Sequence, residues 1–166
     1  HPLSRRQRQM CIRDRTNSLD PHQADLVGVS LSSKIGKACY IPIGHNSKKC
    51  INKDIVLKKL KPLLEDPSIK KIGQNIKFDF IVFFNHGITV SAMEDTMLMS
   101  YVLDAGKNRH NMDTLSEIHL NHKTIKFKEL VGSGKKQINF SEVDLEKAKD
   151  YAAEDADITY RPVSYT

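Results

Sequence analysis

The stretch SEVDLEKAKDYAAEDADITY, residues 141–160, decides the fold that this sequence predicts. Ser141, with Asp144 three residues later, resembles the capping box that begins a helix. The residues that recur behind it at i, i+3 and i+4 spacing are Leu145, Ala148, Ala152, Asp155 and Thr159. This spacing places them on one face of a helix, and we expect that face to be buried.

Asp155 stands out on this face because it is a carboxylate in the middle of a stripe of small and apolar residues. Tyr151 lies one turn earlier at the edge of the stripe, so its hydroxyl and the Asp155 carboxylate can face one site. We expect Glu154, Asp157 and Asp150 to face water. A buried carboxylate is costly unless a cation, a metal or several donors compensate it. Two interpretations stay open: a structural carboxylate paired with an arginine or capping another element, and a cation ligand.

The length and composition are those of one globular domain with a core of its own. The chain has 166 residues, of which 39% are hydrophobic and 28% charged. Its formal net charge of +6 favours polyanions such as nucleic acid, and a basic surface without a partner is the alternative. No apolar run is long enough for a membrane span, and no signal-peptide pattern is present, so we expect a cytoplasmic protein. Three widely spaced cysteines predict neither a disulfide framework nor a zinc site.

The remaining elements are predicted from apolar periodicity and turn residues. Strands are expected at 27–31, 38–43 and 69–74, and helices at 56–64, 76–86, 95–104 and 112–120. The first two strands form an antiparallel hairpin. Asn75 is expected to cap the helix at 76–86, and Gly87 to end it in the left-handed conformation. Asp95 is the expected N-cap of the helix at 95–104, whose expected inward residues are Met97, Leu98, Tyr101 and Val102.

Asp79 is a second carboxylate next to an apolar face. On the helix at 76–86 it shares one side with Ile76, Phe80 and Phe83, and it comes just after a strand. Ligand sites in mixed α/β folds commonly lie at such strand–helix junctions. Two acids on separate apolar stripes favour a cation site over two unrelated structural carboxylates.

Five segments carry a resemblance to a known family. They are KIGQNIKFDF (71–80), EDTMLMSYVL (94–103), RHNMDTL (109–115), HKTIKFKEL (122–130) and YAAEDADIT (151–159). In this order they resemble the 3′–5′ proofreading exonuclease domain of bacterial DNA polymerase I, a family A polymerase, over residues 16–160. The resemblance implies an α/β domain with a ribonuclease-H-like mixed β-sheet flanked by α-helices, in the acidic, metal-dependent exonuclease superfamily. It also implies hydrolysis of 3′-terminal nucleotides of DNA in the parent protein.

The resemblance further implies a set of site residues. Members of the family hold two divalent metal ions, usually Mg²⁺ and otherwise Mn²⁺ or Zn²⁺, with four carboxylates. Asp79 and Asp155 match two of these metal ligands, and Tyr151 matches the tyrosine that orients the attacking water. Positions that hold or wedge a frayed 3′ end are matched by Asn75, Leu19 and Phe127. For Leu19 and Phe127 a place in the core is the alternative.

The partners follow from the same resemblance. The expected substrate is a single-stranded or frayed 3′ end of DNA, and a polymerase domain is expected downstream in the parent chain. No membrane partner is expected, and the domain is expected to be a monomer.

The sequence departs from the family at the other two metal ligands. In the family an acid-x-acid pair directly precedes the segment that is TNSLDP here, residues 16–21, but Arg13 and Arg15 occupy the two acid positions. Asp14 is expected to point to the opposite face, because side chains alternate along a strand. Two guanidiniums would repel the metals and pair with Asp79 and Asp155 instead. We therefore expect this chain to hold the metal ions improperly and to be inactive.

Both ends of the chain fall outside the resemblance. Residues 1–15 are expected to be a non-native segment, unstructured or poorly packed, residues 16–160 the exonuclease domain with a truncated first strand, and residues 161–166 a non-native tail. The alternative is a natural chain whose proofreading site has decayed. Two other functions stay open: a non-catalytic scaffold or single-strand-binding module of a polymerase, and a ribonuclease-D-like RNA exonuclease. The segments DTML and HKTI favour the polymerase relative.

Overall fold

The computed structural model describes residues 8–47 and 49–161. Its secondary structure consists of β1 (Arg8–Thr16), β2 (Leu26–Lys34), β3 (Lys37–Pro42), α1 (Lys53–Glu65), β4 (Ile69–Gly73), α2 (Ile76–Asn85), β5 (Met93–Asp95), α3 (Thr96–Asp104), α4 (Met112–Leu120), α5 (Phe127–Val131), the short 3₁₀ helices η1 (Gly134–Lys136) and η2 (Phe140–Glu142), and α6 (Leu145–Tyr160). Within the described residues no helix is both long and apolar enough to cross a membrane.

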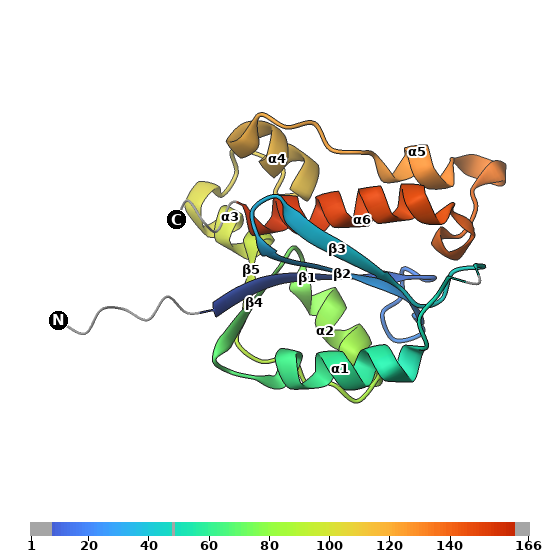
Figure 1. Cartoon of the computed structure of the whole chain (residues 1–166). Coiled ribbons are helices and arrows are strands. Elements are labelled where there is room, and N and C mark those ends of the chain that lie inside the picture. The colour runs from blue at the N-terminus through green and yellow to red at the C-terminus, as the bar shows by residue number, and fades with distance from the viewer. Residues whose placement is uncertain (1–7, 48, 162–166) are drawn as a thin grey trace.

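The five strands form one mixed sheet in the order β3-β2-β1-β4-β5. Strand β2 pairs antiparallel with both β1 and β3, whereas β4 pairs parallel with both β1 and β5. Helices α1 and α2 cover one face of the sheet, and α6, with α5 beside it, covers the other (Figure 1). The predicted hairpin and the predicted α/β architecture with helices on a mixed sheet are confirmed.

Each face of the sheet has its own core. The residues buried between the sheet, α1 and α2 include Ile12, Val29, Leu60, Leu64, Val82 and Phe83. A smaller cluster on the α6 face consists of Val27, Val131, Phe140, Val143, Ala148 and Tyr151. The predicted stripe of α6 is confirmed, because Ala148, Ala152, Asp155 and Thr159 are at most 1% exposed.

The central strand of the sheet is β1, so residues 8–15, which we expected to be unstructured or poorly packed, form a paired strand. Residues 8–15 lie in this strand, with Cys11 paired to both Ser32 of β2 and Ile72 of β4. A central strand is buried on both faces, so it lacks the apolar–polar alternation by which edge strands are recognised. The first strand is therefore nine residues long rather than truncated. Residues 1–7 and 162–166, the rest of the two expected non-native ends, lie outside the described residues.

Two expectations about buried and exposed positions were wrong. In α3, Leu98, Tyr101 and Val102 are between 57% and 80% exposed, although we expected them to face inward. In α6, Asp157 is buried and accepts the N–H of Gly36 at 2.6 Å, although we expected it to face water. The reason in α6 is that the helix lies against the sheet on one side and the α4–α5 segment on another, so more than one stripe is covered.

Glu154 has partners on this second side of α6. It accepts hydrogen bonds from the N–H of Ile125 and from the ring of His122, both at 2.8 Å, and is half-buried rather than turned to water. Helix α6 itself begins one turn later than predicted. Asp144 is its N-cap and accepts the N–H groups of Glu146 and Lys147, whereas Ser141 belongs to the preceding η2.

Asp95 caps two helices at once and thereby positions the start of α2. One carboxylate oxygen accepts the N–H groups of Asn75 at 3.0 Å and Met97 at 2.9 Å, and the other accepts the N–H of Ile76 at 3.0 Å. The predicted N-cap role of Asp95 in α3 is confirmed. The predicted cap by the Asn75 side chain is wrong: Asn75 is at φ 56° in the left-handed region, and its side chain makes no cap hydrogen bond.

Replacing Asp95 with Ala is expected to lower the free energy of unfolding by about 2–4 kcal/mol, because it leaves three N–H groups without an acceptor. Asn111→Ala is the matched control, since the Asn111 side chain caps α4 through one bond to the Thr114 N–H and should cost about 1 kcal/mol. Urea unfolding followed by circular dichroism measures both. A loss in the Asp95 variant no larger than that in the control would contradict the shared cap.

Candidate active site

A groove of about 860 Å³ lies where the end of β1 meets the start of α2 and the segment around α5. Its lining includes Arg13 and Arg15 from β1, Asn75 and Asp79 at the start of α2, and the more distant Leu19 and Phe127. Six of the eight residues that the sequence singled out thus line one cavity. The other two, Tyr151 and Asp155, lie on α6 in contact with Arg15.

Asp79 lies in the first turn of α2 and is only 3% exposed. One of its carboxylate oxygens accepts the backbone N–H of Asp14 at 2.7 Å. Burial raises the pKa of Asp79, and the neighbouring guanidinium of Arg13 opposes that shift. The carboxylate is thus held against the end of β1 by a main-chain hydrogen bond.

Asp14 is the residue of this site that the sequence did not single out as functional. It is buried, and burial, with the charge of Asp79 as a second cause, raises the pKa of its carboxyl group. Asp14 lines the same groove as Arg13 and Arg15, although we expected its side chain to point to the opposite face. The sequence could not show that the first turn of α2 reaches the end of β1 at this position.

Arg15 and Asp155 form a buried ion pair. The Nη2 of Arg15 donates to Oδ2 of Asp155, whose residue is 1% exposed. The Arg15 guanidinium also lies over the ring of Tyr151, 4.9 Å from its centroid. Burial raises the pKa of Tyr151 to about 12. The expected pairing of an arginine with Asp155 is therefore confirmed, and Arg15 occupies the space in front of both α6 residues.

Arg13 does not form the expected ion pair with Asp79. Its Nη1 donates to the backbone oxygen of Gln74, and the described residues contain no ion pair between Arg13 and Asp79. The negative charges of Asp79 and Asp155 nevertheless both raise the pKa of Arg13, despite its burial. Asp79 accepts its hydrogen bond from the main chain of β1 instead, which explains the failure of the predicted pair.

This donor set does not fit a pair of divalent metal ions. No group of three or more acidic, histidine or cysteine side chains is arranged to hold a metal anywhere in residues 8–47 and 49–161. Hard cations require several oxygen ligands, and here the guanidinium of Arg15 is already bonded to Asp155, while Arg13 lines the same groove as Asp79. Arg13 and Arg15 thus place positive charge in the site where two further carboxylates would be needed to hold the metals.

The three residues matched to DNA contacts all lie on the groove. Leu19 is 95% exposed and Phe127 is 41% exposed, so the alternative that they belong to the core is wrong. Phe127 is supported from behind by Phe140 and Tyr151, with ring centroids 6.1 and 5.9 Å away. Asn75 is also exposed. Apolar and aromatic groups on the rim of a groove are suited to stacking on unpaired bases.

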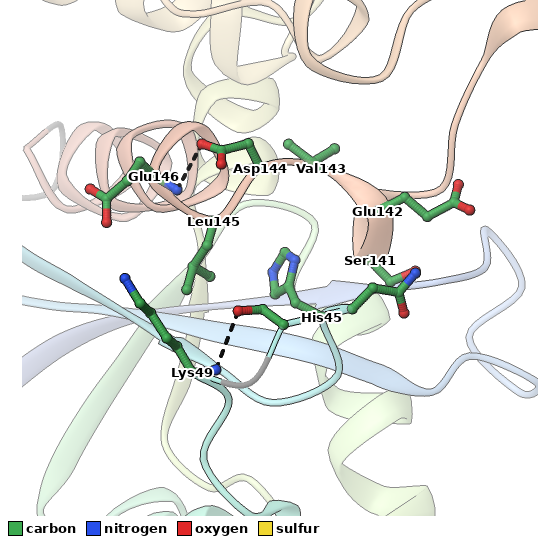
Figure 2. A pocket seen from close by; sticks show the side chains of 10 residues that line it. His45, Lys49, Ser141, Glu142, Val143, Asp144, Leu145 and Glu146 are labelled. Atoms are coloured by element: carbon green, nitrogen blue, oxygen red, sulfur yellow. Dashed lines mark hydrogen bonds between the residues drawn. The ribbon is translucent and has the colours of Figure 1, made fainter.

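A second pocket, of about 310 Å³, lies at the start of α6 (Figure 2). Its acidic groups already have partners, since Glu142 accepts the N–H of Asn139, Asp144 accepts that of Glu146, and the Glu146 carboxylate is paired with Lys149. His45 points toward this segment and is bonded to the Tyr40 hydroxyl at 2.6 Å. None of the predicted site residues lines this pocket, and we assign it to the packing of the 44–47 loop against α6.

The fold and site define a nuclease of the ribonuclease-H-like class. NrnC of Brucella melitensis is similar over 96% of this chain and 71% of its own, with a TM-score of 0.71 and 25% identity. RNase D of Escherichia coli, an exoribonuclease, is similar over 95% of this chain and 38% of its own, with a TM-score of 0.68 and 16% identity. The predicted fold class is confirmed.

The family within this class follows from the sequence. Residues 16–164 match the model of the 3′–5′ exonuclease family of DNA polymerase I, and the chain belongs to that family. DNA polymerase I of Pseudomonas aeruginosa is 45% identical over 152 residues, 88% of this chain and 17% of its own. That of Rhizobium leguminosarum is 42% identical over 167 residues, 88% of this chain and 16% of its own. The chain thus spans about a sixth of the length of these relatives, and the predicted family and enzyme class are confirmed.

Proposed function

We propose that this chain is a DNA-proofreading exonuclease domain whose groove receives a single-stranded or frayed 3′ end, and that it does not hydrolyse that end as written. The single observation that carries the second part is the buried bond between Arg15 and Asp155. A guanidinium bonded to one oxygen of a carboxylate brings a positive charge that opposes the binding of a hard cation there. NrnC, a structural relative, has been solved with bound Mg²⁺, and we propose Mg²⁺, or otherwise Mn²⁺ or Zn²⁺, as the metal of the parent protein.

In this proposal each site residue occupies the position of its family counterpart, but the metal ligands and the tyrosine do not perform their catalytic roles. Asp79 and Asp155 stand at metal-ligand positions, and Tyr151 stands where a hydroxyl would orient the attacking water. Arg15 covers Tyr151 and binds Asp155, so neither side chain is free to act on a phosphodiester. Asn75, Leu19 and Phe127 would contact the last nucleotides of the strand, since all three line the groove.

The chain is expected to leave a 5′-labelled single-stranded DNA oligonucleotide intact in the presence of Mg²⁺. Denaturing gel electrophoresis over several hours measures this, with an active proofreading polymerase as the positive control. A ladder of shortened products that disappears on addition of EDTA would contradict the proposed inactivity. An RNA oligonucleotide of the same sequence tests the ribonuclease-D-like alternative in the same experiment.

The relatives favour DNA over RNA as the ligand. The four curated relatives that are 38–45% identical over at least 87% of this chain are each DNA polymerase I, whereas the likeness to RNase D, at 16% identity, concerns the fold. We propose that the parent chain is such a polymerase, with its polymerase domain downstream. The bond between Arg15 and Asp155 equally favours a non-catalytic module that still binds single strands, and this is the form of the function developed below.

A further inference from the structure

We propose that Arg13 and Arg15 make the groove a site for the phosphates of single-stranded DNA that requires no divalent metal ion. This inference rests on the proposed function, because it assumes that the groove receives a DNA strand. It goes beyond that function by assigning the arginines a binding role of their own.

The charged side chains that line the groove are more basic than acidic. The cations are Arg13, Arg15 and Lys128, and the carboxylates are Asp14 and Asp79. Asp155 does not line the groove and is paired with Arg15. The three cations are side chains that an anion in the groove can contact without the help of a metal.

The two guanidiniums retain donors for a ligand. Of its N–H groups, Arg13 uses one for Gln74, and Arg15 uses its two terminal nitrogens for Asp155 and for the Asp14 carbonyl at 3.2 Å. A phosphate oxygen is a suitable acceptor for the N–H groups of Arg13 that the bond to Gln74 does not use.

The surroundings of the arginines suit a nucleic acid strand better than a free anion. The N–H groups at the start of α2 cannot bind an anion, because those of Asn75 and Ile76 already donate to Asp95. The positive charge is therefore that of side chains on the groove floor. Leu19 and Phe127 on the rim offer surfaces for bases, so the groove combines phosphate and base contacts along one strand.

The effect of metal ions on DNA binding distinguishes this groove from one that has carboxylates at positions 13 and 15. A groove with carboxylates at positions 13 and 15 would carry four acids around one point and would repel a phosphate until cations neutralised them. With arginines at those positions, a phosphate can bind without a metal ion to neutralise the site. Binding of single-stranded DNA to this chain is therefore expected to be the same in EDTA as in Mg²⁺.

The test is fluorescence anisotropy of the whole chain with a 5′-fluorescein oligo(dT) strand, in EDTA and in Mg²⁺ at equal ionic strength. The expected result is equal dissociation constants within about twofold, and a weakening of about 10-fold or more in the Arg13→Gln/Arg15→Gln variant, because charge-assisted bonds to phosphate are lost. The matched control is Lys58→Gln/Lys59→Gln, which removes two exposed cations from α1, outside the groove, and should change the constant by less than about threefold.

Binding that requires Mg²⁺, or a Gln pair variant that binds as tightly as the unchanged chain, would overturn the inference. If the Gln pair fails to fold by circular dichroism, Arg13→Lys/Arg15→Lys replaces it: the charge stays, the planar donors go, and binding should weaken but remain independent of Mg²⁺. Failure of the proposed function has a different signature. In that case a variant with acids at 13 and 15 would neither bind nor cut the strand even with Mg²⁺, whatever the arginines do.

Discussion

Replacing Arg13 with Asp and Arg15 with Glu is expected to give this chain Mg²⁺-dependent 3′–5′ exonuclease activity, at least about 100-fold above the unchanged chain. Even partners outside the ligand set of a metal change activity by about 10- to 100-fold, and here two ligands are restored and one is released. The double substitution removes the cation bonded to Asp155 and a second cation that lines the same groove as Asp79. A 5′-labelled single-stranded oligonucleotide, with and without EDTA, gives the rate.

The matched control for this experiment is Arg13→Gln/Arg15→Gln. It frees Asp155 as the acidic variant does, but it adds no carboxylate, so it should remain as inactive as the unchanged chain. Equal activity of both variants would show that removing the guanidiniums suffices and that positions 13 and 15 are not ligands. An acidic variant that folds and binds DNA but does not shorten it would contradict the assignment of Asp79 and Asp155 as their partners.

The helical part of this site was predictable because the apolar periodicity of a helix identifies its buried face from the sequence alone. Ala148, Ala152, Asp155 and Thr159 repeat with the period of the helix, and all are buried. The same reasoning failed for α3. Periodicity there identifies an apolar face, but it cannot show whether the sheet or another surface lies opposite, and Val102 on that face is 80% exposed.

The sheet was harder to predict where a strand is buried on both sides. In β1, Cys11 and Ile12 are at most 1% exposed although their side chains point to opposite faces of the sheet. The strand therefore shows no alternation of apolar and polar residues. Its arginines added to this difficulty, since a buried arginine is rare unless it is paired. The partner of Arg15 is 140 residues away on α6, and no local pattern contains it.

Contacts between residues distant in sequence account for the rest of what was missed. The bond from the Asp14 N–H to Asp79 and the shared cap of Asp95 both depend on how α2 is placed against the end of the sheet. Spacing identifies which side chains lie on one face of one element. It does not specify which groups of another element meet that face, so Asp79 was found but its hydrogen-bond donor was not.

Asp155→Ala is expected to lower the free energy of unfolding by about 3–5 kcal/mol, because it leaves the guanidinium of Arg15 buried without its counter-charge. The pair itself need not stabilise the fold. Removing two charges from water costs about as much as their attraction returns, so Arg15→Met/Asp155→Leu should change the free energy by less than about 2 kcal/mol. Urea unfolding followed by circular dichroism distinguishes the two variants.

Lys149→Ala is the control, because it breaks the ion pair with Glu146 on the solvent side of the same helix and should have no measurable effect. The comparison also bears on function. If the apolar pair is as stable as the unchanged chain while Asp155→Ala is not, then the fold needs position 155 to be neutralised rather than charged. In that case the stability of the fold does not explain the aspartate at position 155, and its role is to bind a cation, which in this chain is the guanidinium of Arg15.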